Sequence, residues 1–257
     1  SSALNRALGR SHNPAPENGE AQLVLVRMEG DECRISVDTS GPLLHRRGYR
    51  REAGPAPVRE TLAAGLLMRL GWDGSVPLCD PFCGSGTIAI EAAMLAAQRP
   101  PGAGRAFAFM DWPRFRPGLW QVLLDEAVQG GNAGPLPGIG GSDRDAAMVE
   151  IAKRNAQRAG VAPLVSFQAA EVAALPVAPG PGLVFCNPPY GSRLGSSGDL
   201  AAAYRELGRI CRERLGDWQV AFLCPDPRLA ELTGLPLAVD GTFSNGGLDV
   251  QLYRLKR

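Results

Sequence analysis

The apolar residues of this chain form short runs of strand length that alternate with longer stretches of helical spacing. Runs of strand length lie at 76–79, 139–142, 164–169, 183–186 and 220–224. Helical stretches lie at 62–70, 87–97, 146–159 and 200–215. Strands that alternate with helices predict an α/β fold with a mostly parallel sheet wrapped by helices. The segments 235–243 and 248–255, joined at Asn245-Gly246, predict a terminal antiparallel hairpin.

The chain ahead of residue 58 has a different pattern. Residues 1–20 are polar, contain Pro and Gly, and are expected to be loosely ordered. Apolar residues at 23–26 and 33–37 flank a Glu-Gly-Asp turn and predict a β-hairpin. An isolated hairpin is only marginally stable in water. We therefore expect it to pack on the main domain or on an N-terminal part that this chain lacks.

The charged residues nearly balance, because 27 Lys and Arg stand against 26 Asp and Glu for a net charge of +1. The chain has no overall basic field, so any contact with nucleic acid must depend on local patches. His45-Arg46-Arg47-Gly48-Tyr49-Arg50-Arg51 is a basic run with one aromatic residue. It is either a strip that contacts phosphates or a solvated linker.

The cysteines indicate the compartment. The six cysteines include no CxxC pair and only two histidines are present, so we expect no metal site. Cys79, Cys186 and Cys224 lie in apolar runs, which is typical of reduced core thiols and favours the cytoplasm. Neither a signal peptide nor an apolar run of membrane length is found in the sequence, so no membrane partner is expected.

The tetrapeptide Asn187-Pro188-Pro189-Tyr190 follows a short buried strand. Two prolines fix their own φ angles and restrict the residue ahead of them, so the turn is stiff. It presents an amide side chain, a free backbone carbonyl and an aromatic face. These groups suit a flat nitrogen heterocycle with an exocyclic NH2 group. The alternative is a rigid turn in which Tyr190 merely packs.

Three acidic or Gly-rich positions come ahead of that turn, each at the end of a strand. Asp80-Pro81-Phe82-Cys83-Gly84-Ser85-Gly86 joins a strand to a helix, and its glycines allow a ligand to approach the backbone, unless the turn is merely tight. Asp143 is placed to hold ribose hydroxyls or to cap the next helix, although Asp145 or Ser142 could supply that cap. Glu171 could reach an adenine amine or be an ordinary surface residue.

Taken in order, these four features resemble the S-adenosylmethionine-dependent amino-methyltransferases that act on nucleic acid bases. The segments 40–50 and 56–64 narrow the resemblance to the THUMP-associated RNA guanine-N2 methyltransferases, from about Val24 to the C-terminus. The best known bacterial member modifies large-subunit ribosomal RNA, and related members modify tRNA.

The resemblance implies a Rossmann-like class I methyltransferase with a mostly parallel seven-stranded sheet and a C-terminal antiparallel hairpin. It implies three parts: a remnant of a THUMP-like RNA-binding domain (1–40), a basic linker (41–57) and the methyltransferase domain (58–257). Most of the THUMP domain and the second methyltransferase domain of the larger member are expected to be absent from this chain. RNA, rRNA before tRNA, is the expected partner of a monomer.

The resemblance also assigns residues. Asp80, Pro81, Phe82, Gly84 and Gly86 would surround the methionine part of S-adenosylmethionine. Asp143 would hold its ribose and Glu171, where the family usually has Asp, its adenine, with Asn187 facing the methyl group. Catalysis would rest on Asn187, Pro188 and Tyr190, which hold and stack the guanine. The residues expected to contact RNA are Tyr190, Arg46, Arg47 and Arg50.

Two other readings stay open. The same turn serves DNA adenine-N6 and protein glutamine-N5 methyltransferases, because both substrates present an NH2 group. A non-catalytic RNA-binding module that keeps a relic cofactor pocket is the third possibility.

Overall fold

The structure is a computed structural model that describes residues 22–54, 57–132, 134–175, 177–191 and 197–256. The expectation for residues 1–20 lies outside these ranges. The described residues divide into two compact units, one within 22–44 and 106–121 and one within 45–105 and 122–256. No helix in the described ranges is long and apolar enough to cross a membrane.

The smaller unit contains the hairpin that the sequence predicts, formed by β1 (Val24–Glu29) and β2 (Glu32–Val37). Alternate residues of the two strands form an apolar face, on which Val26 pairs with Ile35, and both side chains are exposed. A short 3₁₀ helix, η1 (Ala108–Asp111), belongs to the same unit. Four aromatic rings of this unit pack together, with Phe107 stacked on Phe109 and the other contacts edge-to-face: Phe107, Phe109, Phe115 and Trp120.

The larger unit is built on a sheet of seven strands in the order β5-β4-β3-β6-β7-β9-β8. Five neighbouring strands are parallel: β5 (Ser166–Ala169), β4 (Ile139–Asp143), β3 (Leu78–Asp80), β6 (Gly182–Cys186) and β7 (Trp218–Cys224). The sheet ends in a hairpin of β8 (Leu237–Asn245) and β9 (Leu248–Leu255), whose β9 runs antiparallel to β7. The predicted fold class is therefore confirmed.

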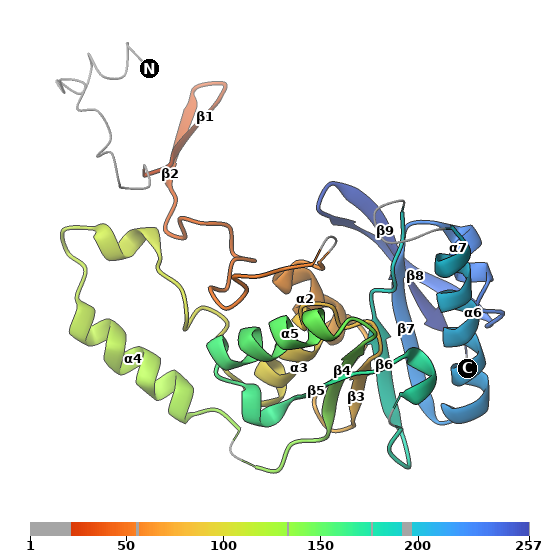
Figure 1. Cartoon of the computed structure of the whole chain (residues 1–257). Helices are drawn as coiled ribbons and strands as arrows, with labels where there is room; N and C mark the ends of the chain where they lie inside the picture. The colour runs from red at the N-terminus through yellow and green to blue at the C-terminus, as the bar shows by residue number, and fades with distance from the viewer. Residues whose placement is uncertain (1–21, 55–56, 133, 176, 192–196, 257) are drawn as a thin grey trace. The chain divides into compact units, whose positions relative to one another are not determined.

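Helices cover both faces of this sheet (Figure 1). One face carries α2 (Glu60–Arg69), α3 (Thr87–Ala96) and α5 (Ala146–Arg158), and the other carries α6 (Ser197–Arg214) and α7 (Pro227–Glu231). Because side chains alternate along a strand, Phe185 enters the first core while its neighbours Val184 and Cys186 enter the second. Along the chain, α4 (Pro117–Gln129) follows α3 and precedes β4. Two short 3₁₀ helices, η2 (Ala162–Leu164) and η3 (Val172–Ala174), follow α5 and β5.

The turn of the terminal hairpin lies one residue later than the sequence predicts. Asn245 is the last residue of β8 and pairs with Leu248, while Gly246 and Gly247 occupy the turn with φ of 62° and 88°. A two-residue hairpin turn with positive φ at both positions favours glycine at each. Because Asn245 lies in the strand and not in the turn, its side chain can bond a neighbouring segment, as described below.

The order of the strands determines where a ligand can lie. The chain passes from β3 to β4 on one side, then returns to place β6 on the other side of β3. A crevice forms outside the carboxyl ends of the strands at such a switch point. Asp80, Asp143, and Asn187 directly after β6, all come from that edge.

Candidate functional site

The Gly-rich turn after β3 is held by backbone hydrogen bonds to β4. Cys83 N donates to Ser142 O at 2.9 Å, and Gly86 N donates to Cys83 O at 2.7 Å. Gly86 begins α3 with φ of 85°, and a Cβ there would lie 2.9 Å from both Ala152 Cβ and Phe167 Cζ. Close packing of α3 on its neighbours therefore explains Gly86, which does not line the cavity described below.

Gly84 differs from Gly86. It has φ of 50°, and a Cβ added there would meet nothing within 4 Å. Its N–H donates to Asp143 Oδ2 at 2.9 Å. The turn thus presents bare backbone to open space at Gly84, which is the close approach expected for a ligand.

Asp143 connects the turn to the next helix. Its Oδ1 accepts a hydrogen bond from Asp145 N at 3.0 Å, in addition to the bond from Gly84. The cap of α5 is supplied by Asp145, whose Oδ1 accepts from Ala147 N at 2.8 Å. Each carboxylate oxygen can accept more than one hydrogen bond, so Asp143 keeps capacity for a ligand.

Asp80 lies at the floor of the site and is 1% exposed. Its Oδ1 accepts a hydrogen bond from Phe82 N at 3.1 Å. Burial, with a smaller contribution from the nearby charge of Asp143, raises the pKa of Asp80 to about 8. Below that pH the Asp80 carboxyl is largely neutral, and a cation beside it would favour the ionised form.

These residues border a cavity of about 630 Å³, a size usual for small-molecule sites. The cavity is lined by these residues that the sequence analysis had proposed for the site: Asp80, Pro81, Phe82, Gly84, Asp143, Glu171, Asn187 and Pro188. The structure therefore brings nearly all of the expected cofactor contacts to one space.

The cavity has two further walls that the sequence analysis did not assign to the site. One comes from Gly54, Pro57 and Val58, and the other from α6, including Asp199 and Glu206. Residues 56–64 were noted for a family resemblance, which could have signalled the first wall. No local pattern indicates that one face of α6 borders a ligand site.

The Asn-Pro-Pro turn points its members in different directions. Asn187 and Pro188 line the cavity, and Asn187 Oδ1 is buried. Tyr190 is 6% exposed and packs in the core on the α2 and α3 side of the sheet. It is not among the described residues that line the cavity. In this structure Tyr190 packs in the core, which is the alternative that the sequence left open for this residue.

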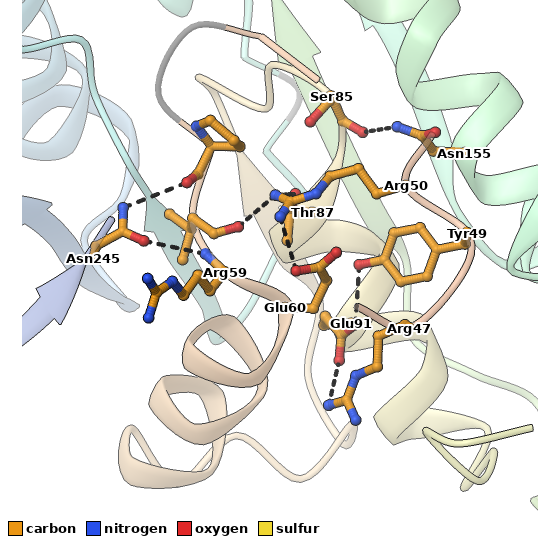
Figure 2. Close-up of polar contacts among 12 residues, drawn as sticks. Arg47, Tyr49, Arg50, Arg59, Glu60, Ser85, Thr87, Glu91, Asn155 and Asn245 are labelled. Carbon is orange, nitrogen blue, oxygen red and sulfur yellow. Dashed lines mark hydrogen bonds and ion pairs between the residues drawn. The ribbon is translucent and has the colours of Figure 1, made fainter. Parts of the chain in front are cut away.

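The basic run turns two of its arginines inward (Figure 2). Arg47 pairs with Glu91 at 3.3 Å, and Tyr49 OH donates to the other oxygen of that carboxylate at 3.0 Å. Arg50 pairs with Glu60 at 2.9 Å. Arg46 is exposed. Of the three arginines expected to contact RNA, Arg47 and Arg50 are engaged with carboxylates inside the protein.

Within the described ranges, no group of three or more His, Cys, Asp or Glu could hold a metal ion. Cys79, Cys186 and Cys224 are buried free thiols, as expected for core positions. Burial raises the pKa of Cys79 to about 12, which makes it a poor nucleophile.

A mostly parallel sheet that ends in an antiparallel hairpin, with a ligand-sized cavity at its switch point, defines a Rossmann-like methyltransferase domain. The chain belongs to the RMKL-like methyltransferase domain family, whose profile matches residues 47–246.

Similar proteins agree with this assignment. The chain is 42% identical over 256 residues to the ribosomal RNA large subunit methyltransferase K/L of Shewanella sp. strain MR-4, covering 93% of this chain and 36% of that protein. The solved structure of SMU.472 in complex with SAH is 33% identical, with a TM-score of 0.81 over 99% of this chain and 67% of its own. A protein described as a predicted N6-adenine-specific DNA methylase from Listeria monocytogenes is 34% identical, with the same TM-score over 99% of this chain and 66% of its own.

Proposed function

We propose that this chain uses S-adenosylmethionine to methylate the exocyclic N2 amine of a guanine in RNA, with large-subunit ribosomal RNA as the substrate. The observation that carries the proposal is the cavity, in which the Gly-rich turn, Asp143, Glu171 and Asn187 border one space. The name of the Shewanella relative supports RNA as the substrate. The chain spans about a third of the length of that relative, so the proposal concerns this part of such a protein.

The residues of the cavity fit S-adenosylmethionine. Its ammonium group and sulfonium carry positive charge, which the Asp80 carboxyl can accommodate, and the open space at Gly84 allows the cofactor to approach the backbone closely. Asp143 retains acceptor capacity for the ribose hydroxyls, and Glu171 is an exposed acceptor for the adenine amine. When bound, this cofactor supplies an electrophilic methyl group on its sulfonium sulfur. SAH, the compound bound to SMU.472, is S-adenosylhomocysteine, the same molecule without that methyl group.

Asn187 and Pro188 hold the amine that is methylated. A guanine amine is a weak nucleophile, because its lone pair is delocalised into the ring. Asn187 Oδ1 and the Pro188 carbonyl would accept its two N–H bonds and so orient the nitrogen lone pair. Two consecutive prolines restrict this turn, so the acceptors are already in place before the base arrives. Orientation of this kind can contribute up to roughly 7–11 kcal/mol to a barrier. The reaction releases one proton from the amine, which water can take.

The burial of Tyr190 changes its part in this proposal. The Tyr190 ring is 6% exposed and packs in the core next to the turn. It would have to leave the core to stack on a base. Among the residues that the structure describes, Phe82 is the aromatic one that borders the cavity. We assign base holding to Asn187 and Pro188 and turn support to Tyr190.

The test uses the methyl group of radiolabelled S-adenosylmethionine. The protein is incubated with ribosomal RNA, transfer RNA, DNA and protein from a strain that lacks it, and labelled nucleosides are identified by mass spectrometry. We expect label in N2-methylguanosine from ribosomal RNA. Label in N6-methyladenine of DNA, or in protein glutamine, would refute the guanine assignment. A folded protein that binds no S-adenosylmethionine in calorimetry would refute the enzyme assignment and favour a binding module.

Methylation of adenine N6 is the second candidate, and one observation favours it. The Listeria relative carries that activity in its name, and the acceptors of Asn187 and Pro188 suit any exocyclic amine. The two products differ in mass spectra of the nucleosides, so the same experiment decides between them. We also propose that the chain acts as a monomer, that its partner is ribosomal RNA, and that it acts in the cytoplasm.

A further inference from the structure

Within the larger unit, the segment that carries the basic run is held by buried polar contacts. Its two inward arginines have similar surroundings, because each arginine side chain is 12% exposed and each pairs with a glutamate whose side chain is 3% exposed or less. Burial raises the pKa of both Glu60 and Glu91, and the paired arginines act in the opposite direction. Arg47 and Arg50 differ in the other contacts that their guanidinium groups make.

Arg50 contacts two residues that line the cavity. Its Nη1 donates to Val58 O at 2.8 Å and makes a longer contact of 3.4 Å with Thr87 Oγ1, while Nη2 holds Glu60 at 2.9 Å. Val58 belongs to the wall of the cavity that precedes α2, and Thr87 is the first residue of α3, directly after the Gly-rich turn. One rigid guanidinium fork therefore joins two parts of the cavity border, at Val58 and at Thr87. Figure 2 shows Arg50 beside Thr87 and its ion-pair partner Glu60.

The wall is also held from its other side. Asn245 Oδ1 accepts a hydrogen bond from Arg59 N at 3.2 Å, and its Nδ2 donates to Pro57 O at 3.5 Å. Asn245 is 5% exposed and comes from β8, at the far end of the sequence. The wall at Pro57 and Val58 is thus placed by side chains and not by regular secondary structure of its own.

Arg47 provides the matched comparison. Its partner Glu91 also accepts the hydrogen bond from Tyr49 OH, and neither Glu91 nor Tyr49 is among the described residues that line the cavity. Loss of either guanidinium leaves a buried carboxylate without its cation, so both losses destabilise the fold. Loss of Arg50 alone removes the link between the wall and the Gly-rich turn.

We propose that Arg50 is a positioning residue for cofactor binding, which sets the spacing between the Pro57-Val58 wall and the N-terminus of α3. The inference rests on the proposed use of S-adenosylmethionine. It assigns Arg50 a role inside the protein in place of the RNA contact that the sequence suggested. The guanidinium does not contact the cofactor; it acts through the Val58 carbonyl and Thr87.

The experiment compares Arg50→Met with Arg47→Met, and measures S-adenosylhomocysteine affinity by calorimetry without RNA together with thermal stability. We expect both variants to lose stability, but only Arg50→Met to weaken binding, by about tenfold or more. The KM for S-adenosylmethionine should rise likewise in Arg50→Met, with kcat less affected. Equal affinity of the two variants would overturn the inference.

Double variants separate stability from positioning. Glu60→Gln added to Arg50→Met, and Glu91→Gln added to Arg47→Met, remove the unpaired charge and should recover stability. Recovery of stability without recovery of affinity in the Arg50 pair supports positioning, and recovery of both overturns it. Absence of binding in the folded wild-type chain would instead overturn the proposed function, and the inference with it.

Discussion

The buried carboxyl of Asp80 should make the stability of this protein depend on pH in a way that one substitution removes. Asp80 is 1% exposed, and its described hydrogen-bond partner is the N–H of Phe82. Burial raises its pKa from 3.8 to about 8. Because each tenfold change in proton affinity equals about 1.4 kcal/mol, the ionised form is disfavoured by on the order of 5 kcal/mol.

The sign follows from where the proton is bound. Between pH 4 and pH 8 the folded state keeps a proton on Asp80 that the unfolded state has released. The free energy of unfolding therefore falls as pH rises through this window, and the loss is complete above pH 8. In Asp80→Asn the side chain is neutral at every pH, so this contribution disappears. The variant should match wild type at or below about pH 4 and exceed its stability by several kcal/mol near pH 8.5.

Urea denaturation of both proteins at intervals across that range measures the difference in the free energy of unfolding. Other buried carboxyls such as Glu60 and Glu91 are present in both proteins and cancel in the difference. Asp73→Asn is a control of opposite sign, because hydrogen bonds from Ser75 lower the pKa of that exposed carboxyl. A difference between wild type and Asp80→Asn that stays constant from pH 5 to pH 8.5 would refute the reasoning.

Three further substitutions test the site. Asn187→Ala should leave S-adenosylmethionine affinity near normal in calorimetry but lower turnover by about two to three orders of magnitude; turnover like wild type would remove Asn187 from the proposed chemistry. Asp143→Ala should weaken cofactor binding, because it removes both the ribose acceptor and the bond to Gly84 N, and an unchanged dissociation constant would contradict this. Gly86→Ala should destabilise the fold by roughly 1–3 kcal/mol, since its Cβ would meet Ala152 and Phe167 at 2.9 Å and φ is positive; thermal denaturation at the wild-type temperature would show the packing argument to be wrong.

Local pattern was enough to predict the strands and the longer helices on both faces of the sheet in the larger unit, but not the short helix α7. Short apolar runs such as 183–186 are buried on both faces, and a helix follows most of them, so a parallel sheet is nearly the only solution. The cavity followed from the same information. Residues at the carboxyl ends of neighbouring parallel strands must meet, which is why Asp80, Asp143 and Asn187 border one space.

The sequence by itself thus determined the sheet, the switch point and most of the cavity border, because these depend on periodicity and on turn chemistry between neighbouring residues. Only the tertiary structure decided that Tyr190 enters the core, that α6 closes one side of the cavity, and that Arg47 and Arg50 turn inward. An arginine in a basic run has the same local pattern whether it faces a phosphate or a glutamate. Its direction depends on which buried carboxylate the packing of α2 and α3 brings within reach, and those carboxylates, Glu60 and Glu91, come from later segments of the chain.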